Sequence, residues 1–211
     1  EIYSYYYYSP VVTGAYFYYG VDSFENSGTI SASASIGDVS GYDAYAEIYS
    51  DDDEAPVVAG VSFYDDVGTF INSGSDTISA SASIGDVSGE DAYAGIWSYY
   101  YGSPVAAGVY FYYGVDSFEN SGTISASASI GDVSGEDAYA EICSYEDEAP
   151  VVAGVFFYDE VGTFTNSGSI LASASIGEVS GDYAGAEIYS YYYYSPVVTG
   201  AYFYYGVDSF E

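Results

Sequence analysis

Residues 26–36 read NSGTISASASI, and close copies of this phrase return as NSGSDTISASASI at 72–84, NSGTISASASI at 120–130 and NSGSILASASI at 166–176. In the first copy Ile and Ala alternate with Ser, which puts the apolar side chains on one face of an extended strand and the hydroxyls on the other. The Asn-Ser-Gly that opens each phrase is typical of a turn. The spacing is not helical anywhere, so the sequence predicts an all-β protein built from tandem units.

The units are nearly equal in length. One proline marks each unit, and the successive spacings are 46, 48, 46 and 46 residues (Pro10, Pro56, Pro104, Pro150, Pro196). The two extra residues are Ser75 and Asp76, whose insertion indicates a surface turn. We expect one continuous array over residues 1–211, with units 1–46, 47–94, 95–140 and 141–186 and a partial unit 187–211. Residues 1–25 recur letter for letter as 187–211, which indicates a window cut from a periodic object.

Identical residues persist in register from unit to unit, as coil-on-coil stacking requires. They include a phenylalanine, a valine and the asparagine of the turn (Phe17, Phe63, Phe111, Phe157; Val21, Val67, Val115, Val161; Asn26, Asn72, Asn120, Asn166). We therefore predict a parallel β-solenoid, or β-helix, with two coils of roughly 23 residues in each unit. The alternatives are an antiparallel β-sandwich-type repeat array and a cross-β fibril.

The aromatic segment of each unit also alternates. In the first unit Ala15, Phe17, Tyr19 and Val21 are expected to share one face of a strand, and the second unit repeats the pattern (Val61, Phe63, Asp65, Val67). For the turn asparagines we expect a ladder that hydrogen-bonds the turn backbone within and between coils.

The charge of the chain restricts its partners. There are 32 carboxylates and no Lys, Arg or His, which gives a formal net charge of −32. Without cationic side chains, binding to nucleic acid and to anionic membrane surfaces is not expected. Nor is membrane insertion, because no apolar stretch approaches the roughly 20 residues that span a bilayer. Because 49% of the residues are hydrophobic, we expect a folded body and not a disordered acidic tail.

Two kinds of unit alternate along the chain. Odd units carry Tyr where even units carry carboxylates: Tyr5–Tyr8 correspond to 51–54, and Tyr19-Gly20 corresponds to Asp65-Asp66. The third and fourth units repeat this switch. Because like charges in adjacent strands repel, interposed Tyr would separate the acidic units and donate hydrogen bonds to them.

The acidic runs are the candidate metal ligands, because clustered carboxylate oxygens without an internal cation suit Ca²⁺. The alternative is a solvated acidic loop. We predict no other cofactor. The candidate ligands are Asp51, Asp52, Asp53, Glu54, Asp65, Asp66, Glu146, Asp147, Glu148, Asp159 and Glu160.

An enzyme is not expected. The chain has no His or Lys to act as a base near neutral pH, and acidic pairs that recur in alternate units do not form a single active site. The single thiol, Cys143, occupies a position held in other units by Tyr3, Tyr49, Trp97 and Tyr189, and is interpreted as a tolerated substitution.

The phrases GIWSYYYG, GVYFYYG, ENSGTISASAS and EDAYA resemble the tandem repeats of large bacterial surface adhesins, of the autotransporter-passenger and haemagglutinin-like type. The resemblance covers every unit. It implies a right-handed β-helix displayed on the cell surface. The chain departs from the family in lacking all basic residues, in its richness in Tyr, and in showing no membrane-anchoring barrel domain.

These observations together predict an extracellular or cell-surface structural and adhesive repeat protein that forms a filament. Its rungs would be extended by end-to-end self-association or by continuation in a longer array. Rows of Tyr are packing residues or an interface, with stacking on polysaccharide as a further possibility. The alternative function is a Ca²⁺-dependent module that binds carbohydrate or another cell.

Overall fold

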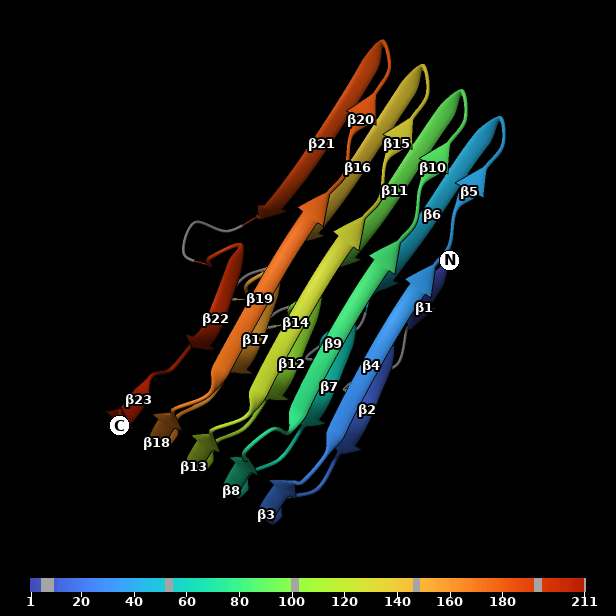
Figure 1. The fold of residues 1–211 in the computed structure, drawn as a ribbon. Coiled ribbons are helices and arrows are strands. Elements are labelled where there is room, and N and C mark those ends of the chain that lie inside the picture. The colour runs from blue at the N-terminus through green and yellow to red at the C-terminus, as the bar shows by residue number, and fades with distance from the viewer. Residues whose placement is uncertain (5–9, 52–54, 100–102, 146–148, 192–194, 211) are drawn as a thin grey trace.

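The chain forms a parallel β-solenoid in this computed structural model (Figure 1). The structure describes residues 1–4, 10–51, 55–99, 103–145, 149–191 and 195–210. Within these residues every regular element is a β-strand. In Figure 1 the copies of one strand lie side by side, as β4, β9, β14 and β19 do, and the array advances from blue to red along the stack.

The strands form five parallel sheets. Sheet A contains β1 (Ile2–Ser4), β6 (Asp43–Ser50), β11 (Asp91–Ser98), β16 (Asp137–Ser144) and β21 (Tyr183–Ser190). Sheet B contains β2 (Val12–Phe17), β7 (Val58–Phe63), β12 (Ala106–Phe111), β17 (Val152–Phe157) and β22 (Val198–Phe203).

Three further sheets close the coil. Sheet C contains β3 (Val21–Asn26), β8 (Val67–Asn72), β13 (Val115–Asn120), β18 (Val161–Asn166) and β23 (Val207–Phe210). Sheet D contains β4 (Thr29–Ile36), β9 (Thr77–Ile84), β14 (Thr123–Ile130) and β19 (Ser169–Ile176). The short sheet E contains β5 (Val39–Ser40), β10 (Val87–Ser88), β15 (Val133–Ser134) and β20 (Val179–Ser180).

One unit makes one coil, which we call a rung. Each strand pairs with its own copy in the next rung, as when Phe63 pairs with Phe17 on one side and Phe111 on the other. The prediction of two coils per unit was therefore wrong. The full-length coil pairs each strand with its own copy, so most rows bring identical side chains together.

The interior has a narrow part and a wide part. Ala and Ile from sheets D and A fill the narrow part, where Ala80, Ala82 and Ala94 are almost fully buried. Phe, Val and Ile from sheets B, C and D fill the wide part. The predicted alternation of β4 is confirmed, because its copies β9 and β14 bury every Ile and Ala and leave the Ser and Thr half-buried on the outer face.

Two phenylalanine ladders run through the wide part. In the first, the ring centroids of Phe17, Phe63, Phe111, Phe157 and Phe203 are 4.9–5.1 Å apart from rung to rung. The second ladder stacks at 5.0–5.3 Å (Phe24, Phe70, Phe118, Phe164). The two ladders meet edge to face, an arrangement that aromatic rings prefer.

The aromatic segment is not one continuous strand as predicted. Sheet B ends at Phe17 and sheet C begins at Val21, so a turn separates them. Ala15, Phe17 and Val21 pack against the core, but Tyr19 is 78% exposed and does not share their face. The equivalent Asp65 also lies in a turn, between β7 and β8.

The predicted asparagine ladder is confirmed. The side-chain amide of Asn26 donates to Asn72 Oδ1, Asn72 donates to Asn120, and Asn120 donates to Asn166, each at 2.8 Å. Asn26 and Asn120 also donate to backbone carbonyls within their own turns, those of Gly28 and Gly122. The ladder thus satisfies the turn backbone and fixes the register between rungs.

Candidate functional site

The predicted metal ligands lie in two kinds of place. Asp65 and Asp66 occupy the turn between β7 and β8, and Asp159 and Glu160 occupy the equivalent turn two rungs later. Asp51 directly follows β6. The remaining candidates, residues 52–54 and 146–148, lie outside the described residues.

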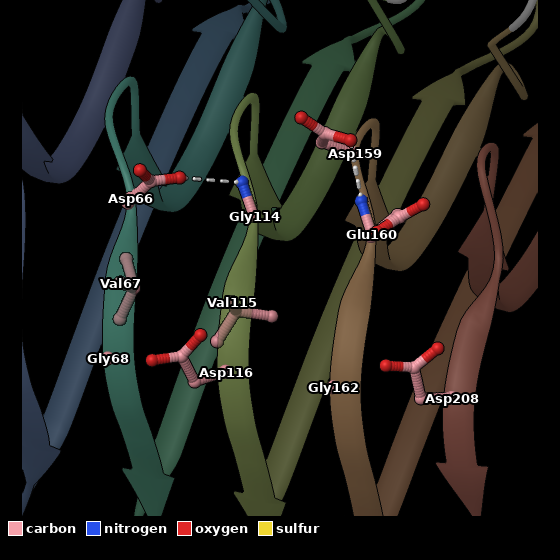
Figure 2. Close-up of a pocket in the computed structure, with 10 residues that line it drawn as sticks. All are labelled: Asp66, Val67, Gly68, Gly114, Val115, Asp116, Asp159, Glu160, Gly162 and Asp208. Atoms are coloured by element: carbon pink, nitrogen blue, oxygen red, sulfur yellow. Dashed lines mark hydrogen bonds between the residues drawn. The ribbon is translucent and has the colours of Figure 1, made fainter.

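Three of the described turn carboxylates accept hydrogen bonds from backbone N–H groups. Asp65 Oδ2 accepts from Gly20 N at 3.1 Å. Asp66 Oδ1 accepts from Gly114 N at 3.2 Å, a contact drawn in Figure 2. Asp65 and Asp159 each also accept from the N–H of the residue that follows them. These donors are backbone N–H groups, and two of them belong to glycines of the Tyr-type rungs.

A further alternation, which the sequence analysis missed, lies on sheet C. Asp22, Asp116 and Asp208 belong to odd rungs, and Gly68 and Gly162 take their place in even rungs. Asp116, Asp208 and the two glycines, together with Asp66 and Glu160, line an acidic groove of about 400 Å³ (Figure 2). The alternation of Asp and Gly is visible in the sequence when position 22 is compared with its equivalents in the other units.

Separation of like charges is not general, however. Asp38, Asp86, Asp132 and Glu178 follow one another in adjacent rungs. Each of the first three accepts a hydrogen bond from the backbone N–H of the next residue in the row, at 2.8–3.1 Å. Carboxylates thus follow one another directly in this row, and the N–H donors offset their repulsion.

The acidic groove holds repeated carboxylates that attract counterions. Within the described ranges, no three His, Cys, Asp or Glu side chains form a group that could hold a metal ion. Binding of Ca²⁺ by the acidic residues stays a prediction.

The repeat is broken most strongly on the outer face of sheet A. Three rows of side chains change their residue type there from rung to rung, within strands that are otherwise in register. The rows are Tyr45, Tyr93, Tyr139 and Gly185; Glu47, Gly95, Glu141 and Glu187; and Tyr49, Trp97, Cys143 and Tyr189. We call the residues around Glu141 the tyrosine–glutamate cluster: Tyr93, Glu141, Cys143, Tyr145 and Tyr189.

Glu141 is the centre of this cluster. It is only 7% exposed, and no cationic side chain exists in the chain. Tyr93 donates its hydroxyl proton to Glu141 Oε1 at 2.6 Å, and Tyr145 donates to the same oxygen at 3.1 Å. Tyr189 donates to Oε2 at 3.4 Å. Three phenols thus take the place of water around a buried carboxylate, which is the compensation that a buried charge requires.

Gly95 lets Tyr93 reach Glu141. A Cβ at position 95 would lie 2.7 Å from the Tyr93 hydroxyl oxygen, so the phenol occupies the space that a side chain would fill. The other described units hold Glu at this position (Glu47, Glu141, Glu187). The Gly95 substitution is therefore part of the site and not a neutral variation.

Burial and the nearby carboxylate keep these groups protonated. Burial and the Glu141 hydrogen bond raise the pKa of Tyr93 above its ordinary value of 10.0. Burial, followed by the charges of Glu141 and Glu187, raises the pKa of Tyr139 to about 12. Burial, with the charge of Glu141, also raises the pKa of the Cys143 thiol to about 12. The phenols remain donors at neutral pH, and Cys143 is an unreactive thiol.

Stacked tyrosines flank the cluster. The ring centroids of Tyr45 and Tyr93 are 5.0 Å apart, and those of Tyr93 and Tyr139 are 6.1 Å apart. Together with Asp43, Asp91 and Asp137 these rings line a groove of about 420 Å³ that ends at Tyr183. Trp97 stacks on Tyr49 at 4.3 Å beside them.

This arrangement can hold a proton and exchange it between phenol and carboxylate. In the sequence Trp97 and Cys143 stand only as variants of one position, and Tyr93, Gly95 and Glu141 were not predicted as site residues. The glycine at position 95, where other units have Glu, was the sequence signal that could have drawn attention to this site. The Tyr93–Glu141 hydrogen bond joins two rungs, so it could not be predicted without knowing the stacking.

No family model matches the chain, and neither a curated protein nor a solved structure is significantly similar to it. The β-solenoid that the adhesin resemblance implied is present, and membership in that family stays a prediction. A separate search of the described residues for bilayer-spanning helices finds none that is long and apolar enough.

Proposed function

We propose that this chain is a rod-forming structural protein of the cell surface or extracellular space, with adhesive outer faces and no catalytic role. The observation that carries the proposal is the register of the rungs, in which each row pairs the same position of every unit. Such a stack has no natural end, because each rung offers the next one the same edge.

The outer surface supports the adhesive part of the proposal. Several tyrosines are largely exposed, among them Tyr19 at 78% and Tyr183 at 74%. Tyrosine is enriched at protein interfaces, where its ring contributes apolar area and its hydroxyl a hydrogen bond. The resemblance to bacterial surface repeats supports the extracellular location.

Cryo-electron microscopy of the purified chain at rising concentration tests rod formation. Five rungs at the spacing of β-strands make an object about 20–25 Å long. The proposal expects rods longer than this, with one 46- or 48-residue coil in each rung. Particles that keep the length of one chain at every concentration would contradict self-assembly, and many identical segments in each rung would instead indicate a cross-β fibril.

An edge variant sharpens this test. In β17, the fourth of the five strands of sheet B, the N–H of Val152 donates a hydrogen bond to the carbonyl oxygen of Val197 in the next rung. Val198 is the equivalent residue in the last rung, so Val198→Pro removes a donor that faces the open edge. We expect a folded chain that no longer extends. Val152→Pro is the comparison, because it breaks an existing bond and destabilises the fold itself.

A glycan array, probed with and without Ca²⁺, tests the adhesive part. Calcium-dependent binding to particular polysaccharides would favour the binding-module function over a purely structural rod. No binding under either condition would remove carbohydrate from the proposal and leave the rod.

A further inference from the structure

We propose that Tyr93 is a site of proton-coupled one-electron oxidation, and that it couples with Tyr45 to form a dityrosine that joins the first two rungs. This inference goes beyond the structural function and does not depend on rod assembly. It rests on a hydrogen bond, a ring distance and a broken row of the repeat, all on the outer face of sheet A.

Glu141 is positioned to accept the proton of Tyr93. Removing an electron from a phenol makes its hydroxyl strongly acidic, so oxidation is easiest where a base already holds that proton. Glu141 Oε1 lies 2.6 Å from the Tyr93 hydroxyl oxygen, within the reach of a positioned general base. Glu141 is compensated only by hydrogen-bond donors, because the chain contains no cationic side chain. The carboxylate is therefore available to take the proton.

Tyr45 is the coupling partner of Tyr93. Tyr45 stacks on Tyr93 with ring centroids 5.0 Å apart and an angle of 16° between the rings. Tyr45 is 50% exposed, which gives its ring room to rotate and gives an oxidant access to it. Tyr139, on the other side of Tyr93, is farther away at 6.1 Å. The geometry therefore selects the pair Tyr45–Tyr93.

The oxidant for the coupling is a peroxide used by a peroxidase. Each phenol loses one electron and its hydroxyl proton, the Tyr93 proton passing to Glu141. The two phenoxyl radicals form a carbon–carbon bond between ring positions ortho to the oxygens. The two ortho hydrogens then move to the oxygens and restore both phenols. In total the pair loses two electrons and two protons, and these reduce one hydrogen peroxide to two waters.

Gly95 gives the Tyr93 site its particular geometry. Its missing side chain lets the Tyr93 phenol lie over the backbone and reach Glu141 of the next rung. Tyr42 also donates to a carboxylate, Glu90 Oε1 at 2.7 Å, but Tyr42 is 67% exposed. The Tyr93 site differs because its acceptor is only 7% exposed and Tyr45 stacks on its ring.

The experiment treats the full chain with horseradish-type peroxidase and hydrogen peroxide, then digests it with a protease that cleaves after Asp and Glu. Tyr45 lies in the peptide 44–47, where it is the single tyrosine, and Tyr93 lies in the peptide 92–116. We expect these two peptides to appear first as a linked species that has lost two hydrogens. Loss of the linked species in Tyr93→Phe assigns the ring in peptide 92–116. Peptide 138–141 has the same sequence as 44–47, so loss of the species in Tyr45→Phe, and its persistence in Tyr139→Phe, assign the other ring to Tyr45.

Glu141→Gln tests the proton acceptor. An amide does not accept the proton, so we expect the linked species to form roughly a hundredfold more slowly, at the low end of what positioned proton acceptors contribute. Glu119→Gln is the matched control on sheet C, where the side chain is exposed and far from the tyrosine rows, and it should couple at the native rate. Circular dichroism of both variants confirms that the strands are retained.

Two results would overturn the proposal. If exposure alone selects the site, the most exposed tyrosines, such as Tyr19 and Tyr183, will be linked or oxidised first. If the Glu141→Gln variant forms the Tyr45–Tyr93 linkage as fast as the native chain does, Glu141 is not the proton acceptor. Tyr45→Phe covers the case of a misfolded Glu141 variant, because it keeps Glu141 and should abolish this linkage alone.

Discussion

At the scale of single residues, the spacing between rungs depends on glycines in sheet B. A Cβ at Gly108 would lie 2.5 Å from the carbonyl oxygen of Gly154 in the next rung and 2.6 Å from Ile124 Cγ2. Both neighbours are held in place, one by the backbone of a central strand and the other by the core. The same close approach recurs at Gly60 and Gly154.

Gly108→Ala is therefore expected to destabilise the solenoid by roughly 1–3 kcal/mol, the usual cost of an overpacked interior. Urea unfolding followed by circular dichroism measures this loss. Gly28→Ala is the control, because its Cβ would meet no heavy atom within 4 Å, and it should leave the stability nearly unchanged. Equal losses in the two variants would mean that close packing does not explain the glycine at position 108.

The buried phenols of sheet A make stability depend on alkaline pH. Burial and neighbouring carboxylates raise the pKa of Tyr139 from 10.0 to about 12 in the folded chain. Below pH 10 both states keep the proton and the stabilisation is complete. Between pH 10 and about 12 the unfolded chain releases the proton first, so stability falls as the pH rises.

We expect the urea midpoint to decline through this interval, with Tyr93 and Tyr145 contributing in the same direction. Tyr139→Phe removes one titrating group and should make the decline shallower. A midpoint that stays level above pH 10 would show that the folded and unfolded phenols ionise alike.

At the scale of the elements, the turn before sheet D absorbs an insertion without losing register. Ser75 and Asp76 lengthen one turn, yet Thr77 still pairs with Thr29 and Thr123 in the flanking rungs. The backbone carbonyl of Asp76 accepts a hydrogen bond from the N–H of Thr123. The carbonyls of Gly28 and Gly122 accept the equivalent hydrogen bonds from Thr77 and Ser169 in the other rungs. Gly74 turns the chain with a positive φ of 65°.

Deleting Ser75 and Asp76 is expected to leave the fold intact and to change the free energy of unfolding by less than about 1 kcal/mol, because Gly74 then takes the place of Asp76. Urea unfolding measures the change. Deleting Ser127 alone is the contrasting variant, since a one-residue slip in β14 turns the residues that follow it in that strand to the opposite face. If both deletions are equally harmful, the turn length is itself a structural requirement.

The elements also show what the sequence can predict. The Ser/Ala alternation of sheet D predicted both its strand and its buried face, because period two is a local property. The turn at residues 18–20 was not predictable in this way, since Tyr favours strands and continues the alternation across it. Coil length and the Tyr93–Glu141 contact depend on which strands become neighbours, and that is a property of the assembled stack.

At the scale of the whole molecule, neighbouring rungs are complementary and not only similar. In sheet C the row of Glu25 continues as Ile71, Glu119 and Thr165, so acidic residues of odd rungs meet neutral residues of even rungs. Asp22 and Asp116 are likewise separated by Gly68. The pattern of sheet C therefore repeats every two rungs. Removing the rung that carries Gly68 and Ile71 would bring Asp22 next to Asp116 and Glu25 next to Glu119.

Deleting residues 47–94 tests this alternation, because it places Asp22 beside Asp116 and Glu25 beside Glu119. Each like-charged pair is expected to cost about 0.2–1 kcal/mol at low salt, and added salt should recover most of that cost. The melting temperature of this variant should then rise more steeply with salt than that of a chain lacking residues 47–140, whose first junction keeps the alternation. Adding Asp116→Gly and Glu119→Ile to the single-rung deletion restores an even-type neighbour, and the extra salt dependence should disappear. If it persists, the net charge of the rod governs the salt effect, and the two-rung alternation has no energetic role at this junction.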